Sequence, residues 1–321
     1  RDRLRSRGLG DVYKRQGVGG ASLGSLGRGT GAYNRILDDL KAAKILADRE
    51  GKTLSMPAFI WTQGETDHQD RKTREWYREK MEKLIRDINH DARAVTGQKN
   101  DVVCFGYQVG SHLNYYQFNP TDYPAIALEQ LDMALEKDSQ YVMTTPMYHF
   151  EYSDGVHLTA PMSRLYGEYV GYVMKKVLLD GADWKPVHPL NHKIRKSGKG
   201  WTVEVAFYAP CPPLVLDTKT VDDPGNYGFS LVGAEGEDIA IKSVRLVGKN
   251  AVQLLTEKDP GKGRLRYGMT INEHRPSGPR TGARGCLRDS QGDEVKAHIQ
   301  GKDYRMDNWC PFFDYSLSKG H

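Results

Sequence analysis

Between residues 30 and 180, segments with the apolar spacing of amphipathic helices alternate with short apolar segments typical of strands. The helical segments are 30–50, 76–95, 124–137 and 160–179, and the strand-like segments between them are 54–62, 101–109 and 140–146. Strands that alternate with helices predict a parallel sheet with helices on both faces. This alternation therefore predicts an α/β domain for the first part of the chain.

The pattern changes after about residue 185. Segment 201–208 (WTVEVAFY) alternates polar and apolar residues, and further strand-like segments follow it between clusters of Pro and Gly. We therefore expect an all-β domain over 190–321, a sandwich or a jelly roll. The boundary between the two domains is predicted within 184–192.

The basic charge is concentrated in the first sixteen residues. The whole chain has a net charge of +5, and without residues 1–16 it keeps 40 basic and 39 acidic residues. The body is therefore not expected to bind nucleic acid. Segment 1–16 begins with Arg and has no apolar stretch, so it is not a signal peptide. We expect it to be a non-native adapter or cloning sequence, with a basic tail as the alternative.

The first group of polar residues that could act in chemistry follows a predicted strand, at Trp61–Asp67 (WTQGETD). In an open parallel sheet, ligands bind beyond the carboxyl ends of the strands. Gln63 could donate its amide to a developing oxyanion there, and Gly64 would permit a tight turn. The alternative is an ordinary polar turn.

A second group, Asp154–His157 (DGVH), lies in the predicted loop between the last strand and the last helix. A histidine general base needs a partner that fixes its tautomer, and an aspartate three residues earlier can reach it. A solvated aspartate and a histidine that caps the helix would give the same pattern.

A third group is the glycine-rich segment Gly17–Ser22 (GVGGAS). Such a turn can direct backbone N–H groups at an anion. It lacks the lysine of a phosphate-binding loop, so a nucleotide site is not expected. A plain flexible loop is the alternative.

These three groups together resemble the later sequence blocks of the SGNH hydrolases, and most closely the sialate O-acetylesterase-like carbohydrate esterases. The resemblance covers residues 17–180 and implies a flavodoxin-like three-layer α/β/α fold. It implies His157 as the base and Asp154 as its orienting partner. It also implies an oxyanion hole made by Gly20, or Gly19, and Gln63, with Gly64 and Glu65 shaping the site.

One part of the family pattern has no match, namely the nucleophilic serine in a GQSN-like or GDS-like turn after the first strand. We expect this first block to be lost upstream, so that 17–185 is an incomplete hydrolase domain and the chain is nearly inactive. Ser22 is the candidate nucleophile within the chain, although it lies in the oxyanion block.

The substrate implied by the resemblance is an O-acetylated sugar in a glycan or polysaccharide. No cofactor is expected, and the polar clusters around Asp67 and His149 lack the paired helical histidines of a zinc site. No run approaches the roughly 18 apolar residues that a membrane span needs, so no membrane partner is expected. Four scattered cysteines leave the compartment open, and secretion or a periplasmic location is consistent with a glycan esterase. The alternatives are a non-catalytic glycan-binding module and a structural protein of a phage tail or cell surface.

Overall fold

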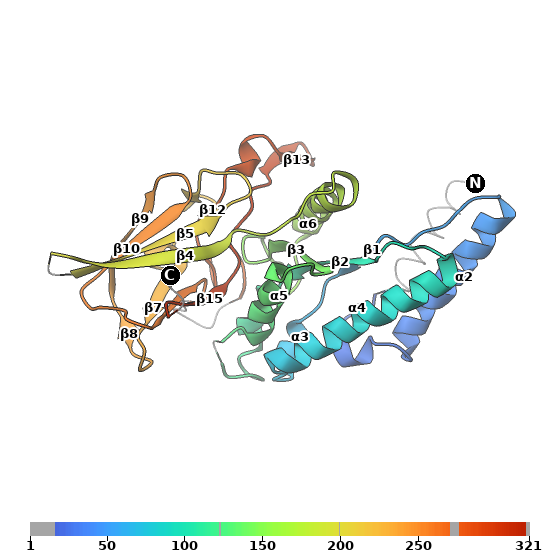
Figure 1. Cartoon of the computed structure of the whole chain (residues 1–321), viewed down its shortest axis with the longest axis horizontal. Helices are drawn as coiled ribbons and strands as arrows, with labels where there is room; N and C mark the ends of the chain where they lie inside the picture. Colours follow the sequence, from blue (N-terminus) through green and yellow to red (C-terminus); the bar gives the residue numbers. More distant parts are fainter. Residues whose placement is uncertain (1–16, 122, 199, 270–275, 319–321) are drawn as a thin grey trace.

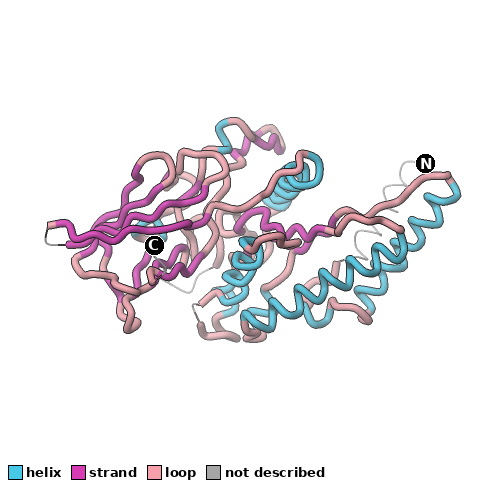
Figure 2. Tube along the Cα trace, in the orientation of Figure 1, coloured by secondary structure: helices cyan, strands magenta, loops and turns pink. Residues whose placement is uncertain are grey.

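The computed structural model describes residues 17–121, 123–198, 200–269 and 276–318. Residues 1–16, which we expect to be non-native, lie outside the described residues. Figure 1 shows a helix-rich part, coloured blue to green, beside a strand-rich part, coloured yellow to red, and Figure 2 shows the same division by secondary structure. The predicted order, a parallel α/β region followed by antiparallel β-sheets, is confirmed.

The α/β region is built on a three-stranded parallel sheet with the order β1-β2-β3. The strands are β1 (Ala58–Trp61), β2 (Val103–Gln108) and β3 (Tyr141–Pro146). Each lies within a segment that the sequence predicts. All three strands run in the same direction, so their carboxyl ends meet at one edge of the sheet.

Helices cover both faces of this sheet. They are α2 (Gly31–Arg49), α3 (Glu65–Gln69), α4 (Arg74–Thr96), α5 (Ala125–Leu135) and α6 (Ala160–Met174), which continues as a π-helical turn (Lys175–Leu179). Cys104 and Met143 pack in one apolar cluster with α4 and α5, whereas Phe105 and Val142 pack with α6. Neighbouring strand residues point to opposite faces, which gives the three layers. In the described part of the chain no helix is both long and apolar enough to cross a membrane.

The β region contains two four-stranded antiparallel sheets, with the orders β4-β5-β10-β9 and β15-β11-β7-β8. The first consists of β4 (His188–Ser197), β5 (Gly200–Tyr208), β10 (Ala251–Thr256) and β9 (Ile241–Val247). The second consists of β15 (Phe313–Ser316), β11 (Arg264–Tyr267), β7 (Phe229–Val232) and β8 (Asp238–Ile239). Two further pairs are β6 (Val215–Leu216) with β12 (Leu287–Arg288), and β13 (Lys296–Ile299) with β14 (Lys302–Arg305). Apolar residues of both four-stranded sheets share one buried cluster, as in a sandwich.

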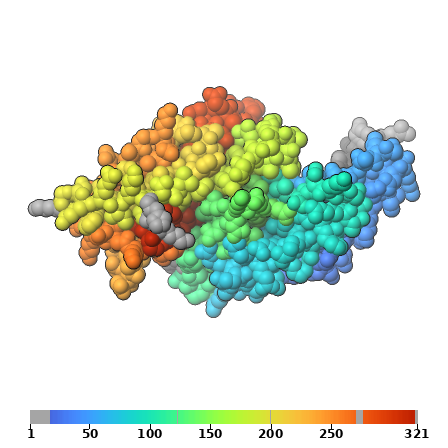
Figure 3. All heavy atoms as spheres, in the orientation of Figure 1, coloured from blue at the N-terminus to red at the C-terminus, as the bar shows by residue number. Residues whose placement is uncertain are grey.

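The β region packs against the carboxyl end of the parallel sheet. The buried Gln108 amide, at the end of β2, donates to the backbone oxygen of Phe312 (2.9 Å) and accepts from the Phe312 N–H (2.7 Å). The Phe312 ring stacks on Tyr148, which follows β3, at a centroid distance of 5.2 Å. One apolar cluster therefore spans the two regions, and they form a continuous surface in Figure 3. The division into a hydrolase domain and an accessory domain stays a prediction.

All four cysteines are free thiols. Cys104 is buried in β2, and burial raises the pKa of its thiol well above the usual value. A disulfide among the three C-terminal cysteines, which the sequence permits, is not formed.

Candidate active site

The predicted site residues lie on three segments. Gln63, Gly64 and Glu65 follow β1, Asp154 and His157 follow β3, and the glycine-rich segment precedes α2. The first two groups are at the carboxyl edge of the parallel sheet, where α/β folds bind their ligands.

Asp154 and His157 form a direct pair. The ring Nδ1 of His157 lies 2.7 Å from Asp154 Oδ2, and Asp154 Oδ1 accepts the backbone N–H groups of His157 (2.7 Å) and Val156 (2.9 Å). These donors hold the pKa of Asp154 well below its usual value, the His157 backbone N–H contributing most. An ionised carboxylate can only accept, so Nδ1 carries the ring proton and Nε2 is left with its lone pair. The side chain of His157 is 79% exposed, so Nε2 is open to a reacting group.

The loop that carries this pair is held by its own backbone and by a neighbour. Ser153 donates to the carbonyl of His157 from its N–H (2.8 Å) and from its hydroxyl (3.0 Å), and Tyr152 pairs with Leu158 in a β-bridge. Gly155 has a φ of +83°, which suits glycine. The side-chain amide of Asn114 donates to the carbonyl of Gly155. The Asp–His pair therefore lies on a turn whose backbone is held by hydrogen bonds.

Gly64 lies at a point where only glycine fits. Its φ is +150°, and a β-carbon there would lie 2.6 Å from Val109 Cγ2 and 3.0 Å from Gln130 Nε2. Gln130 also donates to the backbone oxygen of Gln63 (3.1 Å) and accepts from the Val109 N–H (2.9 Å). The end of β1 is therefore fixed against the end of β2.

The side chain of Gln63 ties the end of β1 to the glycine-rich segment. Its amide nitrogen donates to Asp67 Oδ2 (2.6 Å) and to the backbone oxygen of Ala21 (3.2 Å). Asp67 also accepts the Leu23 N–H at 3.2 Å. Asp67 is fully buried, and this burial raises the pKa of its carboxyl. The sequence suggests Asp67 only as a weak metal candidate, yet in the fold it joins the two segments that carry the predicted oxyanion donors.

Gly19 and Gly20 are exposed and follow one another in this segment, with Gly20 at a φ of +66°. Ser22 contacts Ser25, since its hydroxyl lies 3.4 Å from the Ser25 hydroxyl and its carbonyl accepts from that hydroxyl at 2.8 Å. Within the described residues, no serine hydroxyl is hydrogen-bonded to the ring of His157. The structure therefore brings the glycine segment to Gln63 but does not join Ser22 to His157.

Glu65 is half-buried and is held by Tyr107. The Tyr107 hydroxyl, at the end of β2, donates to both carboxylate oxygens at 2.7 and 2.9 Å. Burial raises the pKa of Glu65, and the hydrogen bond from Tyr107 and the positive charge that His157 carries when it is protonated oppose this rise. Glu65 and His157 thus belong to one electrostatic environment. Tyr107 lies in a predicted strand, and nothing in the sequence marks it as a partner of Glu65.

Tyr115 is an aromatic residue that interacts electrostatically with both Glu65 and Asp154. Its pKa is raised to about 12 by burial and by the charges of Glu65 and Asp154. Tyr148 and Phe150, which follow β3, are fully buried and so are closed to a sugar ring. Those two rings are packed in the apolar cluster between the regions.

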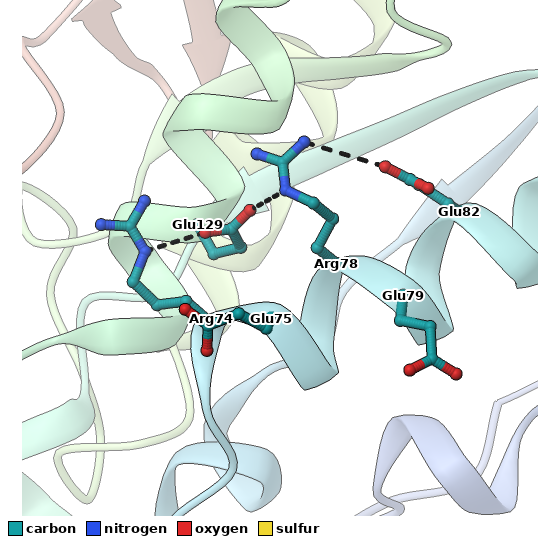
Figure 4. A pocket seen from close by; sticks show the side chains of 6 residues that line it. All are labelled: Arg74, Glu75, Arg78, Glu79, Glu82 and Glu129. Atoms are coloured by element: carbon teal, nitrogen blue, oxygen red, sulfur yellow. Dashed lines mark hydrogen bonds and ion pairs between the residues drawn. The ribbon is translucent and has the colours of Figure 1, made fainter.

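One other polar cluster differs from this site. A groove between α4 and α5 is lined by Arg74, Glu75, Arg78, Glu79, Glu82 and Glu129 (Figure 4). Its two arginines are already paired, since the buried Glu129 binds both of them. Across the ranges that the structure describes, no three His, Cys, Asp or Glu side chains are grouped to hold a metal ion.

A comparison with models of protein families matches residues 15–175 to SASA, described as "Carbohydrate esterase, sialic acid-specific acetylesterase". The matched span contains the parallel sheet and every predicted site residue from Gly19 to His157. A search of curated proteins finds no match.

Proposed function

The chain belongs to the carbohydrate esterase family of sialic acid-specific acetylesterases, and we propose that it acts on sugar O-acetyl groups through His157 and Asp154. The observation that carries this proposal is the 2.7 Å contact between His157 Nδ1 and Asp154 at the carboxyl edge of the parallel sheet, with the ring largely exposed. The substrate is an acetylated sialic acid or a related acetylated carbohydrate.

The proposed reaction is acyl transfer to a hydroxyl. Nε2 of His157 takes the proton of a serine hydroxyl as its oxygen attacks the acetyl carbonyl, and Asp154 stabilises the imidazolium that forms. The imidazolium then gives this proton to the departing sugar oxygen. Water, deprotonated by the same ring, releases acetate from the acyl-enzyme and restores the serine hydroxyl.

The oxyanion of the tetrahedral intermediate would be bound by the backbone N–H of Gly20 and the side-chain amide of Gln63. The bond from Gln63 to Ala21 supports this pairing, because it holds the two donor segments together. The amide would turn one N–H from the Ala21 carbonyl, its longer contact, to the oxyanion. Losing one such donor typically lowers the rate by about 10²–10³-fold.

We further propose that this chain turns over slowly. The Ser22 hydroxyl is directed at Ser25, and no serine hydroxyl of the described residues is hydrogen-bonded to the ring of His157. A site that lacks one member of a triad typically keeps about 10³–10⁴-fold catalysis over water from its remaining groups. Fast turnover that Ser22→Ala abolishes would instead make Ser22 the nucleophile.

The experiment measures deacetylation of an O-acetylated sialic acid, as acetate released to water and as acetohydroxamate formed when hydroxylamine is added as an external nucleophile. A matched control exists, because His298 forms the same contact with Asp303, also at 2.7 Å. His157→Ala is expected to lower the protein-dependent rate about 10²-fold, the lower end of general-base catalysis, and His298→Ala to leave it unchanged. Equal effects of the two changes, or no acceleration by the wild-type chain even with hydroxylamine, would overturn the proposal.

The same observation about the serines favours one second candidate, a sugar-binding protein without catalysis. In that case the chain would bind the acetylated sugar, and neither His157→Ala nor hydroxylamine would change the rate of acetate release.

A further inference from the structure

The segment Pro276–Ala283 of the β region reaches the carboxyl edge of the parallel sheet. The hydroxyl of Ser277 donates to the carbonyl of Gly110, two residues beyond β2, at 3.0 Å. Ser277 is 5% exposed, so this bond is shielded from water. Gly110 is packed tightly, since a β-carbon there would lie 2.9 Å from the backbone nitrogen of Tyr148. The contact therefore joins the β region to the ends of two parallel strands.

The same segment touches the turn that carries the Asp–His pair. A β-carbon on Gly155 would lie 2.9 Å from the β-carbon of Pro276 and 2.6 Å from the amide nitrogen of Asn114. Gly278 approaches the chain just before the turn, where its β-carbon position lies 3.7 Å from the Phe150 carbonyl oxygen and 3.8 Å from the Tyr152 ring. Gly155 is thus enclosed between the α/β region and the β region.

The segment is itself firmly attached to the β region. The carbonyl of Pro279 accepts the Asp222 N–H at 2.8 Å, and the Arg280 side chain pairs with the Asp222 carboxylate at 2.5 Å. The chain that leads to Asp222 is fixed by Asp217, which pairs with Arg288 at 2.7 Å where both side chains are about nine-tenths buried. Contacts of this kind hold a segment in one conformation. A displacement of Gly155 is therefore opposed by the β region.

We propose that Ser277 and Pro276 are positioning residues for the Asp154–His157 pair, so that the β region is a part of the active site rather than an appendage. This inference rests on the proposed function for its catalytic meaning. Ser277 anchors the segment to Gly110, and Pro276 then packs against Gly155 together with Asn114.

The pair needs such support because it is exposed. The side chains of His157 and Asp154 are 79% and 55% exposed, so little packing of their own restrains them. A misplacement of about 1 Å in a catalytic group can cost about 10²-fold in rate. Support of the backbone at Gly155, between the two members of the pair, restrains both.

The test measures amide hydrogen exchange at Val156 and His157, whose N–H groups donate to Asp154. Ser277→Ala and Pro276→Gly are each expected to accelerate this exchange about fivefold, as expected for the loss of one net contact of typical strength. Amide exchange in strand β10, which lies in the sheet β4-β5-β10-β9, should not change.

Ser290→Ala is the matched control. The Ser290 hydroxyl also donates to a backbone carbonyl, that of Pro213 at 2.7 Å, but both residues belong to the β region. This variant is expected to leave exchange at Val156 and His157 unchanged. If Ser277→Ala and Pro276→Gly both leave it unchanged too, or if Ser290→Ala accelerates it equally, the proposal is overturned.

This readout does not depend on ester hydrolysis. Faster exchange in Ser277→Ala, together with a rate that His157→Ala does not lower, would leave the support of the turn in place and reject the esterase proposal alone.

Discussion

The molecule contains two His–Asp pairs with nearly the same local geometry, one in each region. His157 and Asp154 in the α/β region, and His298 and Asp303 in the β region, each place Nδ1 2.7 Å from a carboxylate oxygen. Their side chains are exposed to a similar extent, 79% and 55% in the first pair and 69% and 67% in the second. By distance and exposure alone, neither pair would be preferred as a catalytic site.

The pairs differ in what surrounds them. His298 and Asp303 face each other across the hairpin of β13 and β14, where opposite charges commonly pair. Asp154 instead accepts two backbone N–H groups besides the ring, and its turn lies at the carboxyl edge of a parallel sheet near Glu65. The carboxyl edge and the held turn, not the His–Asp distance, therefore distinguish a candidate active site from an ordinary surface pair.

The largest difference between the pairs should be in catalysis. Asp154→Ala is expected to lower the protein-dependent rate of acetate release about 10²-fold, because the His157 ring loses the partner that fixes its tautomer. Asp303→Ala should change the rate by less than about twofold. The measurement is the assay with an O-acetylated sialic acid, and comparable losses in the two variants would remove the distinction between the pairs.

The next largest difference should be in the free energy of unfolding. The turn next to each His–Asp pair contains a glycine whose substitution tests it. Gly155 and Gly301 have similar backbone angles, with φ of +83° and +78°. An added β-carbon would meet Asn114 and Pro276 at Gly155 but has no neighbour within 4 Å at Gly301.

Gly301→Ala should therefore cost only the backbone strain, about 1–2 kcal/mol of unfolding free energy. Gly155→Ala should cost a further 1–3 kcal/mol or so, because its neighbours must move. Urea denaturation of the two variants measures both values. Equal losses of unfolding free energy in the two variants would show that the neighbours of Gly155 leave room for a β-carbon.

The smallest expected effect is in the pH dependence of stability. The pKa of Asp154 is lowered in the folded protein, so its contribution to stability is present above the unfolded value of about 3.9 and is lost as pH falls through the lower folded pKa. Asp154→Asn should therefore lower the urea midpoint at pH 7 and have less effect below about pH 4. The shift should be small, because the side chain is half exposed and solvent screens it.

Urea midpoints of the wild type and of Asp154→Asn at several pH values provide the measurement. Asp303→Asn is the control for a surface pair, since Asp303 accepts a hydrogen bond from His298 and, within the described residues, from no other group. A difference between Asp154→Asn and the wild type that grows as the pH falls would contradict a lowered pKa for Asp154 in the folded protein.

Most of the fold follows from local sequence patterns. The apolar spacing predicts the three parallel strands and four of the helices. The short helix α3 is not predicted, because five residues give too little periodicity. The contact of Gln108 with Phe312 is not predicted either, because it joins residues 204 positions apart.

In the site, too, contacts between residues close in the sequence could be predicted and contacts between distant residues could not. Asp154 and His157 are three residues apart, so a local pattern can bring them together, as the 2.7 Å contact does. Asn114 and Pro276 reach Gly155 only through tertiary packing, and no spacing in the sequence indicates this. The pair of His298 and Asp303 is not predicted from the sequence either, because it depends on the register of a hairpin.

Ligand binding would show whether the pair at His157 marks a sugar ester site and the pair at His298 does not. Ring resonances of both histidines can be followed by NMR while an O-acetylated sialic acid is added to the chain, which does not require turnover. We predict a saturable shift of the His157 ring with no shift at His298. A shift at His298 alone, equal shifts at both rings, or no shift at either would contradict this assignment.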